Sequence, residues 1–489
     1  MSTALIALEA QIRKDLAKTA HPDARWLEPV PGPDARPALD VLIVGAGQSG
    51  IATAFGLMRS QVTNILALDK AEEGQEGPWL SYARMPTLRS PKHFTGPDLD
   101  IPSLTYQSWH EARFGQEHWQ NLALIPRPLW AEYLLWFRRV VDIPVRNGCE
   151  LLEIAPASDG LLAALVERAG VVETLYARKI VLATGQEAMG NWMIPEPLRH
   201  LPDTLVARTS DAIDFDALRG KHVAVIGAGA TAFDNAATAL EAGAAEVHLL
   251  CRRAEIQLIQ PYIWLTFRGF LRHFSDLDDA WRWRFMRAIL DLREGFPQAT
   301  YDRCARFANF HLHEGSPVER AKELGTKVFG NQELGDKVEL QTPRGNIRAN
   351  FVICGAGTDI DFSERRELKN FAGNIAAWAD RYQPPENERS PRLGRYPYLA
   401  DDYALTERIP GQTPWISNIH LFAFASTMSF GPSGSSINAM TTAIPKLVHG
   451  LTRGLFRADL EQHWASFKAY DVAQAIVARP IQAPDKRGV

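Results

Sequence analysis

Cysteine is scarce in this chain, and its few copies are scattered. Only four cysteines occur among 489 residues, and no two of them form a Cys-x-x-Cys pair. This spacing suggests neither a disulfide framework nor a redox dithiol. Two of the four stand at the ends of apolar strands, where a small buried thiol is expected. The four are Cys149, Cys251, Cys304 and Cys354.

The sequence also lacks a charge bias and long apolar runs. Its formal net charge is −4 at pH 7, so no basic excess indicates binding to nucleic acid or to an anionic membrane surface. No apolar stretch reaches the roughly 18 residues that a transmembrane helix needs. Residues 1–30 carry several charges and contain no secretory apolar core, which favours a cytoplasmic protein.

Two glycine-rich segments each follow an apolar strand and precede a helix. Residues 40–50 read DVLIVGAGQSG, and residues 222–232 read HVAVIGAGATA. In each, the first glycine permits a tight turn, the second lets the backbone approach a pyrophosphate, and the third small residue lets the helix pack closely. The helix start offers unpaired N–H groups and partial positive charge to the phosphates. Two such segments predict a protein that binds two dinucleotides and passes a hydride between them.

The end of the next strand distinguishes the two segments. After the first, the strand at residues 65–68 ends at Asp69, which can accept hydrogen bonds from ribose hydroxyls and would repel a 2′-phosphate. After the second, the strand at residues 247–251 ends at Arg252 and Arg253, whose guanidinium groups suit a phosphate dianion. We therefore expect FAD at the first site and NADPH at the second. The alternative for the two arginines is that they are solvated surface charges.

Three regions depart from this nucleotide-binding pattern. Residues 4–20 form an amphipathic helix before a Pro/Gly-rich linker, and this arm could clasp its own domain or join a homo-oligomer. Residues 88–102 form a loop dense in proline, glycine and polar residues, and such loops tend to line sites. Aromatic residues recur at helical spacing among arginines from 262 to 310. We favour a helical subdomain with its own core there; a lid or substrate tunnel over the cofactors is the alternative.

One short tract places two imidazoles close together. His311-Leu312-His313 alternates like a strand, which would put both histidines on one face. No third ligand stands nearby in the sequence, so no metal site is predicted.

The predicted fold is α/β, with two Rossmann-like dinucleotide-binding domains. The strands at residues 180–183 and 351–354 both end in small residues. We interpret them as the two points where the chain leaves a flavin domain, which an inserted nucleotide domain interrupts. The expected parts are an N-terminal helical arm and linker (1–38), the first part of the FAD domain (39–190), the NADPH domain (191–350) with a helical, aromatic-rich insertion at about 255–320, and the second part of the FAD domain with C-terminal helices (351–489).

The chain resembles the flavin-dependent monooxygenases with two dinucleotide-binding domains. This class includes flavin-containing monooxygenases, Baeyer–Villiger enzymes and amine N-hydroxylases. The resemblance covers residues 40–449, and it depends on the two glycine-rich segments and on the motifs at residues 69–70, 77–79 and 183–185. Residues 202–212 depart from the pattern, because they lack the Phe-x-Gly-x-x-x-His linker of the first two groups. The departure leaves the type of oxygenation open.

The resemblance implies an FAD- and NADPH-dependent monooxygenase. It would transfer one oxygen atom from a flavin C4a-(hydro)peroxide to a small-molecule substrate, by N- or S-oxygenation, hydroxylation or Baeyer–Villiger insertion, with O2 as co-substrate. Arg89, Lys92 and His93 are the candidate catalytic residues beside the flavin, against the alternative that they bind its pyrophosphate or cap the loop. The predicted cofactor-binding residues are Gly45, Ala46, Gly47, Gln48, Ser49, Gly50, Asp69, Lys70, Gly77, Trp79, Ser90, Thr184, Gly185, Gly227, Gly229, Ala230, Thr231, Ala232, Arg252, Arg253 and Gly357.

One other function remains as an alternative to oxygen transfer, and two more are disfavoured. An NADPH-dependent flavin reductase or dehydrogenase would use the same scaffold. A disulfide reductase would need a close cysteine pair near the flavin, and the segment after the first glycine-rich motif contains none. A flavoprotein acting as a redox sensor is disfavoured, because the second glycine-rich segment is intact.

Overall fold

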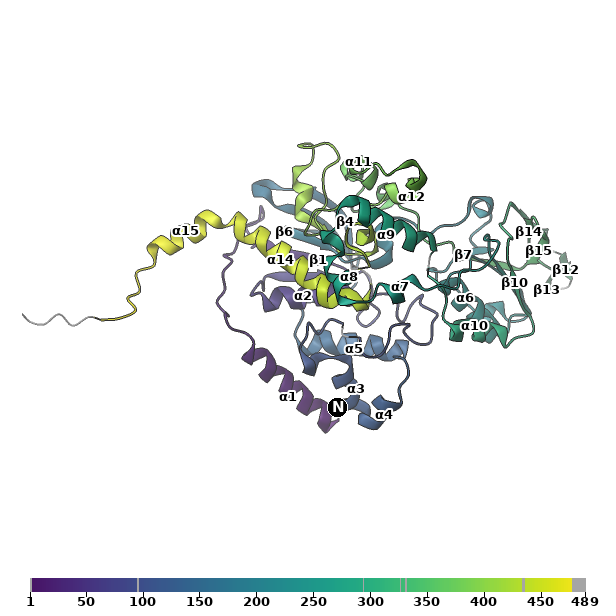
Figure 1. Ribbon diagram of the computed structural model, residues 1–489, viewed down its shortest axis with the longest axis horizontal. Coiled ribbons are helices and arrows are strands. Elements are labelled where there is room, and N and C mark those ends of the chain that lie inside the picture. The colour runs from purple at the N-terminus through teal and green to yellow at the C-terminus, as the bar shows by residue number, and fades with distance from the viewer. Residues whose placement is uncertain are drawn as a thin grey trace, which may run out of the picture.

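The computed structural model of the chain describes residues 2–94, 96–292, 294–325, 327–329, 332–432 and 436–476. Two sheets form the cores of two α/β units that lie side by side (Figure 1). The seven-stranded sheet of the first unit runs in the order β3-β2-β1-β6-β5-β4, with β17 also beside β6; the second has the order β10-β9-β8-β16-β7. The predicted α/β fold with two nucleotide-binding units is confirmed.

The first unit pairs strands from both ends of the chain. Its parallel strands are β1 (Leu39–Val44), β2 (Ile65–Leu68), β3 (Val145–Arg146), β6 (Val171–Leu182) and β17 (Ile419–Leu421), and β4 (Cys149–Pro156) and β5 (Leu162–Arg168) extend β6 as an antiparallel meander. Helix α2 (Gln48–Arg59) crosses α14 (Met440–Ala458) closely, since a Cβ at Gly56 would lie 2.8 Å from a methyl carbon of Val448.

An aromatic layer packs beside this sheet on three helices, α3 (Tyr106–Phe114), α4 (Gln116–Asn121) and α5 (Arg127–Val140). Trp109, Trp130 and Tyr133 are each at most 1 % exposed. The rings of Trp130 and Tyr133 lie 5.1 Å apart between centroids, a spacing at which aromatic pairs attract one another.

The N-terminal arm packs on its own domain. Helix α1 (Thr3–Lys18) buries Leu5 and Ile12 in the core of the first unit. Asp15 accepts a hydrogen bond of 2.7 Å from the Ser103 hydroxyl, and Glu9 accepts one of 3.1 Å from the indole N–H of Trp136. These contacts correspond to the clasp that the sequence allowed, and a role of the arm between subunits stays a prediction.

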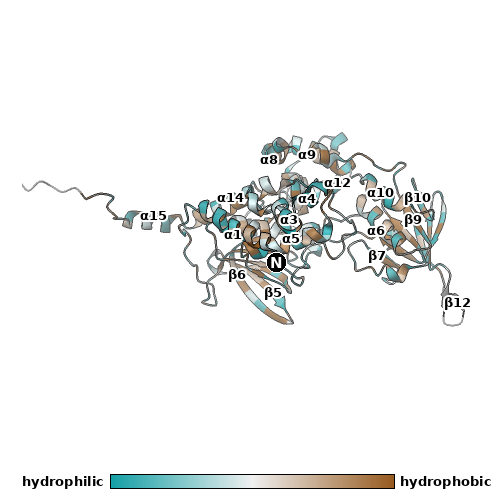
Figure 2. Ribbon diagram, turned by 90° about the horizontal axis from the view of Figure 1, so that it is seen from below, coloured by the Kyte–Doolittle hydropathy of each residue, from teal (hydrophilic) through white to brown (hydrophobic). Residues whose placement is uncertain are grey.

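The second unit is a three-layered structure. Its strands are β7 (Val206–Arg208), β8 (His222–Ile226), β9 (Glu246–Leu250), β10 (Phe310–His313) and β16 (Phe351–Cys354), all parallel. Helices α6 (Ala230–Glu241) and α10 (Gln298–Ala305) cover one face, and an antiparallel sheet of β11 (Arg320–Glu323), β14 (Val338–Thr342) and β15 (Gly345–Ala349) packs on the other. A hairpin of β12 (Lys327–Phe329) and β13 (Gln332–Leu334) projects from this unit (Figure 2).

Strand β16 lies in the second sheet, where it pairs with β8 and β7. The expected boundary at residue 350 assigned this strand to the FAD domain. Its pairing places it with the second unit instead, because it continues the parallel order of that sheet. The chain returns to the first unit after this strand, and β17 is the strand that completes the first sheet.

The helical insertion also packs differently from our favoured interpretation. Helices α7 (Pro261–Trp264), α8 (Arg268–His273) and α9 (Asp279–Leu292) do not enclose a separate core, since Trp283 and Met286 belong to the core of the first unit. The indole N–H of Trp283 donates to the carbonyl of Glu388 at 2.9 Å, close to α11 (Trp378–Arg381). The insertion therefore attaches the second unit to the first.

The last helix of the described residues extends away from the molecule (Figure 1). This helix, α15 (Leu460–Ala469), has no buried residue. Among the described residues, no helix combines the length and apolar character that crossing a bilayer requires.

Candidate functional site

A cavity of about 910 Å³ opens at the carboxyl edge of the first sheet and reaches the second unit. Residues at the ends of β1, β2 and β6 line it, and so do Thr231 and Asp234 from the first turns of α6. Ligands of open α/β sheets bind at this edge, where loops and helix starts converge. Lining residues from both units indicate a place where two bound molecules can meet.

The first glycine-rich turn is shaped by backbone contacts. Gly45 has φ +100°, and a Cβ there would lie 2.5 Å from the carbonyl oxygen of Ala183. A Cβ at Gly50 would lie 1.8 Å from the oxygen of Gly45, so α2 lies directly against the turn. No side chain caps the start of α2 at Gly47. Its first N–H groups can therefore bind a pyrophosphate, which fits a dinucleotide.

Asp69 lies where the first site needs an acceptor for a ribose. It lines the cavity, and its carboxylate accepts hydrogen bonds of 2.8 Å from the N–H of Ala46 and 2.9 Å from that of Ala71. Burial raises the pKa of Asp69, and these hydrogen bonds oppose the rise. A carboxylate oxygen accepts more than one hydrogen bond, so the geometry leaves capacity for hydroxyl donors.

Most of the other predicted contacts of the first site line the same cavity. They are Gln48, Ser49, Lys70, Gly77, Trp79, Thr184 and Gly185, together with Gly45 and Gly47. Trp79 is 8 % exposed, and its buried indole N–H has no hydrogen-bond partner among the described residues. A buried donor without a partner is unfavourable, and an acceptor on a bound cofactor would satisfy it.

The second glycine-rich turn repeats this geometry. Gly227 has φ +116°, and a Cβ there would lie 2.4 Å from the oxygen of Gly355. A Cβ at Gly355 would lie 2.9 Å from that of Ala232, so the small third residue lets α6 approach the sheet. Gly229 faces open space and precedes a helix that no side chain caps. The N–H groups at this helix start, from Ala230 onward, fit a second pyrophosphate.

The two arginines after β9 lie in different environments. Arg253 donates to the carbonyls of Leu292 at 3.0 Å and Asp291 at 2.6 Å, at the end of α9. Arg252 is exposed and contacts no acidic group within the described part of the chain. The predicted contact of Arg252 with a 2′-phosphate stays a prediction, whereas Arg253 is engaged with the end of α9.

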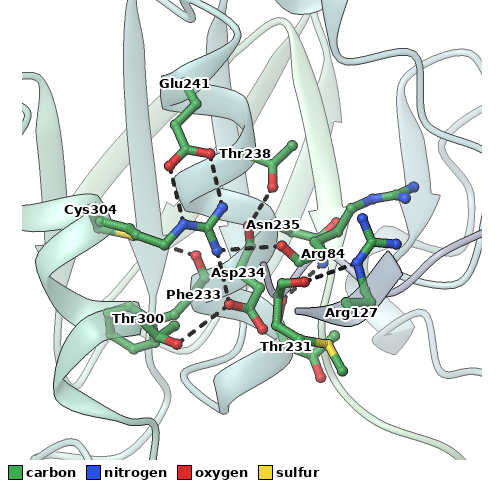
Figure 3. A network of polar contacts seen from close by, with 12 residues as sticks. Arg84, Arg127, Thr231, Phe233, Asp234, Asn235, Thr238, Glu241, Thr300 and Cys304 are labelled. Atoms are coloured by element: carbon green, nitrogen blue, oxygen red, sulfur yellow. Dashed lines mark hydrogen bonds and ion pairs between the residues drawn. The ribbon is translucent and has the colours of Figure 1, made fainter. Parts of the chain in front are cut away.

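A buried carboxylate joins the two units beside the cavity. Asp234 of α6 is 2 % exposed and accepts contacts of 2.5 Å from Arg89 of the first unit and 3.2 Å from Arg303 of α10. The network continues from Asp234 to Thr300 and, through Arg303, to Glu241 (Figure 3). Burial raises the pKa of Asp234 although both arginines lower it. Sequence reasoning missed Asp234, because only the fold shows that this position on the helix faces the other unit.

The three candidate catalytic residues lie in different places relative to the cavity. Arg89 lines the cavity, but Lys92 and His93 are not among its lining residues in the described structure. Lys92 donates to the carbonyls of Trp119 and Gln120 at 2.7 and 3.2 Å, and the ring of His93 meets that of Trp119 edge-on at 5.8 Å. These contacts favour a structural role for both, and their catalytic role stays a prediction.

Several predicted cofactor contacts are not among the lining residues of this cavity: Ala46, Gly50, Ser90 and Gly357, and, of the second site, Gly227, Gly229, Ala230, Ala232, Arg252 and Arg253. Gly357 accepts a hydrogen bond of 2.8 Å from the N–H of Met193 where the chain leaves the second unit. The positive φ of Gly357, +88°, suits that turn.

The histidine pair of β10 has neighbours that its sequence context did not show. Glu246 and His248 of β9 lie beside His311 and His313. The third ligand that was absent from the local sequence thus comes from a strand more than 60 residues earlier.

Loss of the Arg89 ion pair should destabilise the protein in a pH-dependent way. We expect Arg89→Ala to cost about 1–3 kcal/mol at neutral pH, because a buried carboxylate loses its closest counter-charge and keeps only Arg303. Removal of Arg89 would raise the folded-state pKa of Asp234 further above 3.8. The cost should therefore be small below pH 3.8 and grow as pH rises through the folded-state pKa.

Urea denaturation of the variant and the parent over that pH range measures this effect. Arg306→Ala is the matched control, since Arg306 pairs with Glu241 at 2.7 Å but is 57 % exposed. Surface pairs contribute about 0–1 kcal/mol. If both variants lose the same free energy of unfolding at every pH, the buried ion pair does not stabilise the protein as proposed.

Comparison with known proteins places these features in a family. The FAD-NAD(P)-binding family matches residues 42–187. Over 473 residues the chain is 36 % identical to the FAD-dependent urate hydroxylase of Xanthomonas campestris pv. campestris, covering 96 % of this chain and 97 % of that protein. The reduced form of ornithine hydroxylase from Pseudomonas aeruginosa (TM-score 0.65, 18 % identity) and the Kutzneria sp. 744 ornithine N-hydroxylase (0.66, 16 %) have a similar fold over 86 % of this chain and all of theirs.

Proposed function

The chain belongs to the family of FAD-dependent monooxygenases that includes the urate hydroxylase of Xanthomonas campestris, and we propose that it hydroxylates urate or a closely related anionic purine. As a member of this family, the chain transfers one oxygen atom to a small molecule and depends on FAD and NADPH. The substrate is the part that we propose.

A single arginine at the cavity carries the proposal. Arg84 lines the cavity, and its buried Nε has no hydrogen-bond partner among the described residues. Its guanidinium lies 5.2 Å from the ring of Phe215 in the second unit and close to Arg127 (Figure 3). Burial lowers the pKa of Arg84, with a smaller contribution from Arg127. Its Nη1 donates to the carbonyl of Ser81, which leaves Nε as the unpaired donor. A half-buried cation with an unpaired donor favours a planar anion, and urate is an anion at neutral pH.

Aromatic residues complete this part of the cavity. Tyr82 and Trp192 line it, with their ring centroids 5.8 Å apart at an angle of 73°. Burial and the nearby carboxylate of Glu187 raise the pKa of Tyr82 to about 12, so its hydroxyl stays protonated and can donate to an oxygen. The buried indole N–H of Trp192 also lacks a partner among the described residues. A flat, oxygen-rich purine ring is suited to such walls.

Each part of the chain then has a role in the reaction. FAD, when bound, would supply hydride acceptance from NADPH and activation of O2, and the residues of the chain would hold and orient the reactants. We infer that the start of α2 binds the FAD pyrophosphate and that Asp69 binds its ribose. The start of α6 and Arg252 would bind NADPH. Arg84 orients the anionic substrate, and the aromatic walls with Trp79 exclude water from the reacting atoms.

Substrate-dependent turnover tests the proposed reaction. We expect urate to stimulate NADPH oxidation and O2 uptake by the FAD-bound enzyme, with little H2O2 release, while ornithine and lysine do not. NADPH oxidation that yields an equal amount of H2O2 with and without urate would support a reductase instead. Stimulation by an amine and not by urate would overturn the proposed substrate.

Arg84→Ala tests how the substrate is bound. We expect the KM for urate to rise roughly 10- to 100-fold, because a hydrogen bond to a charged group contributes about 1.5–3 kcal/mol. Reduction of the flavin by NADPH in the absence of urate should change much less. Arg84→Lys should restore part of the affinity, since charge remains but the planar fork is lost. An unchanged KM in Arg84→Ala would place the substrate elsewhere in the cavity.

A further inference from the structure

Four side chains of metal-ligating types share one face of two paired strands, and none of them is among the lining residues of the cavity. In the parallel register of β9 and β10, His311 lies opposite His248. Side chains two residues apart in a strand share a face, so Glu246 lies on the face of His248, and His313 on that of His311. The opposite face, with Val247 and Leu249, packs in the core under α6.

The ligand atoms are already close to one another. One atom each from Glu246, His248 and His311 lie within 4.8 Å of one another. The Oε2 atom of Glu246 is 3.1 Å from Nε2 of His248, and the rings of His248 and His311 stack with centroids 4.8 Å apart. Zinc binds imidazole nitrogen and carboxylate oxygen at about 2.0–2.2 Å. A metal among these three groups therefore needs only a small approach of the side chains.

A fourth histidine supplies the orienting contact that metal-bound imidazoles have. Nδ1 of His248 lies 3.0 Å from Nε2 of His313. If Nε2 of His248 faces the metal, its Nδ1–H donates to His313, which fixes the tautomer. Metal-ligating histidines usually donate their second N–H to such a partner.

The surroundings favour neutral imidazoles. His248 has only 15 % of its side chain exposed and packs against His311 with stacked rings. Two stacked imidazolium rings would repel each other, whereas neutral imidazoles are the form that binds zinc. His222 on β8 is nearby but pairs with Asp336 at 2.9 Å, so it is not part of this set.

We propose that Glu246, His248 and His311 form a binding site for a divalent transition metal, with Zn²⁺ as the best match and His313 as the positioning residue. Two nitrogen ligands and one oxygen suit zinc, with water in the fourth position. The site would join the edge strand β10 to β9 and so stabilise the second unit. It goes beyond the proposed reaction and does not depend on it.

Metal titration of the tag-free, FAD-bound enzyme tests the site. After treatment with a chelator, we expect Zn²⁺ to bind with one-to-one stoichiometry by calorimetry and to raise Tm. X-ray absorption should show nitrogen and oxygen ligands at about 2.0–2.2 Å. His311→Ala should abolish both effects, and His313→Ala should weaken binding roughly 10- to 100-fold. His200→Ala is the control, because His200 is exposed and lies outside the cluster.

The outcomes distinguish a metal-binding site from a cluster of side chains that only hydrogen-bond to one another. Absence of one-to-one binding, or equal binding by His311→Ala and the parent enzyme, would overturn it. If His311→Ala loses its flavin or its cooperative unfolding, Glu246→Gln replaces it, since it keeps the shape of the side chain and removes the anionic ligand. Unchanged zinc affinity in a folded Glu246→Gln variant would equally overturn the three-residue site.

Discussion

Gly45→Ala should yield an enzyme that no longer retains FAD. The substitution puts a Cβ 2.5 Å from the Ala183 oxygen at a residue with φ +100°, a conformation that L side chains rarely adopt. The two atoms nearest to this Cβ, the O and C atoms of Ala183, belong to the backbone, so no side-chain rotation can relieve the clash. Strain and overpacking together cost about 2–5 kcal/mol, which lowers FAD affinity roughly 30-fold or more if the turn opens. The flavin-to-protein ratio of the purified variant, followed by FAD titration, measures this loss.

Gly373→Ala is the control for this substitution. Gly373 is exposed, has no atom within 4 Å of an added Cβ, and does not have a positive φ in the strained range. It should bind FAD like the parent enzyme. Full flavin content in Gly45→Ala would mean that the pyrophosphate does not depend on this turn, and the assignment of the first site would fail.

Arg252→Ala should reduce the preference for NADPH over NADH. Arg252 is the exposed guanidinium at the end of β9, and a charge-assisted contact to the 2′-phosphate is the interaction that distinguishes the two donors. We expect the KM for NADPH to rise roughly 10- to 100-fold, as loss of a hydrogen bond to a charged group predicts, with the KM for NADH nearly unchanged. Stopped-flow reduction of the flavin by each donor measures both values.

Arg253→Ala is the control that distinguishes an effect on phosphate binding from an effect on stability. Its guanidinium donates to the last carbonyls of α9, so its loss should lower Tm and leave the ratio of the two donors almost unaltered. A change in donor preference in Arg253→Ala, with none in Arg252→Ala, would exchange the roles that the structure indicates for the two arginines. Higher ionic strength should weaken NADPH binding to the parent enzyme more than to Arg252→Ala.

Local sequence was sufficient to predict those features that depend on residues adjacent in the chain. The glycine turns around Gly45 and Gly227 need a strand before them, small residues within them and a helix after them, all within about 12 residues. Asp69 likewise follows from its place at the end of the next strand. The cofactor classes and the α/β fold could therefore be predicted, and the family comparison confirms them.

The domain boundary was harder to predict from the sequence. The apolar segment at β16 and the one that ends β6 look alike, because strands buried on both faces share the same composition. Only hydrogen-bond pairing assigns β16 to the second sheet. The aromatic spacing of α9 likewise predicts a buried face but not its partner, which is the first unit.

The sequence alone was sufficient to predict two dinucleotide-binding turns and the two cofactors, because these predictions depend on residues that are close in the chain. Which strand-end residues contact each dinucleotide stays a prediction. Tertiary structure alone decided that Asp234 meets Arg89, that Arg253 is engaged with α9 while Arg252 stays exposed, and that Glu246 and His248 lie beside His311. Those pairs join residues that are distant in sequence. Coulombic attraction and ligand geometry act through space, and spacing along the chain does not fix the distances on which they depend.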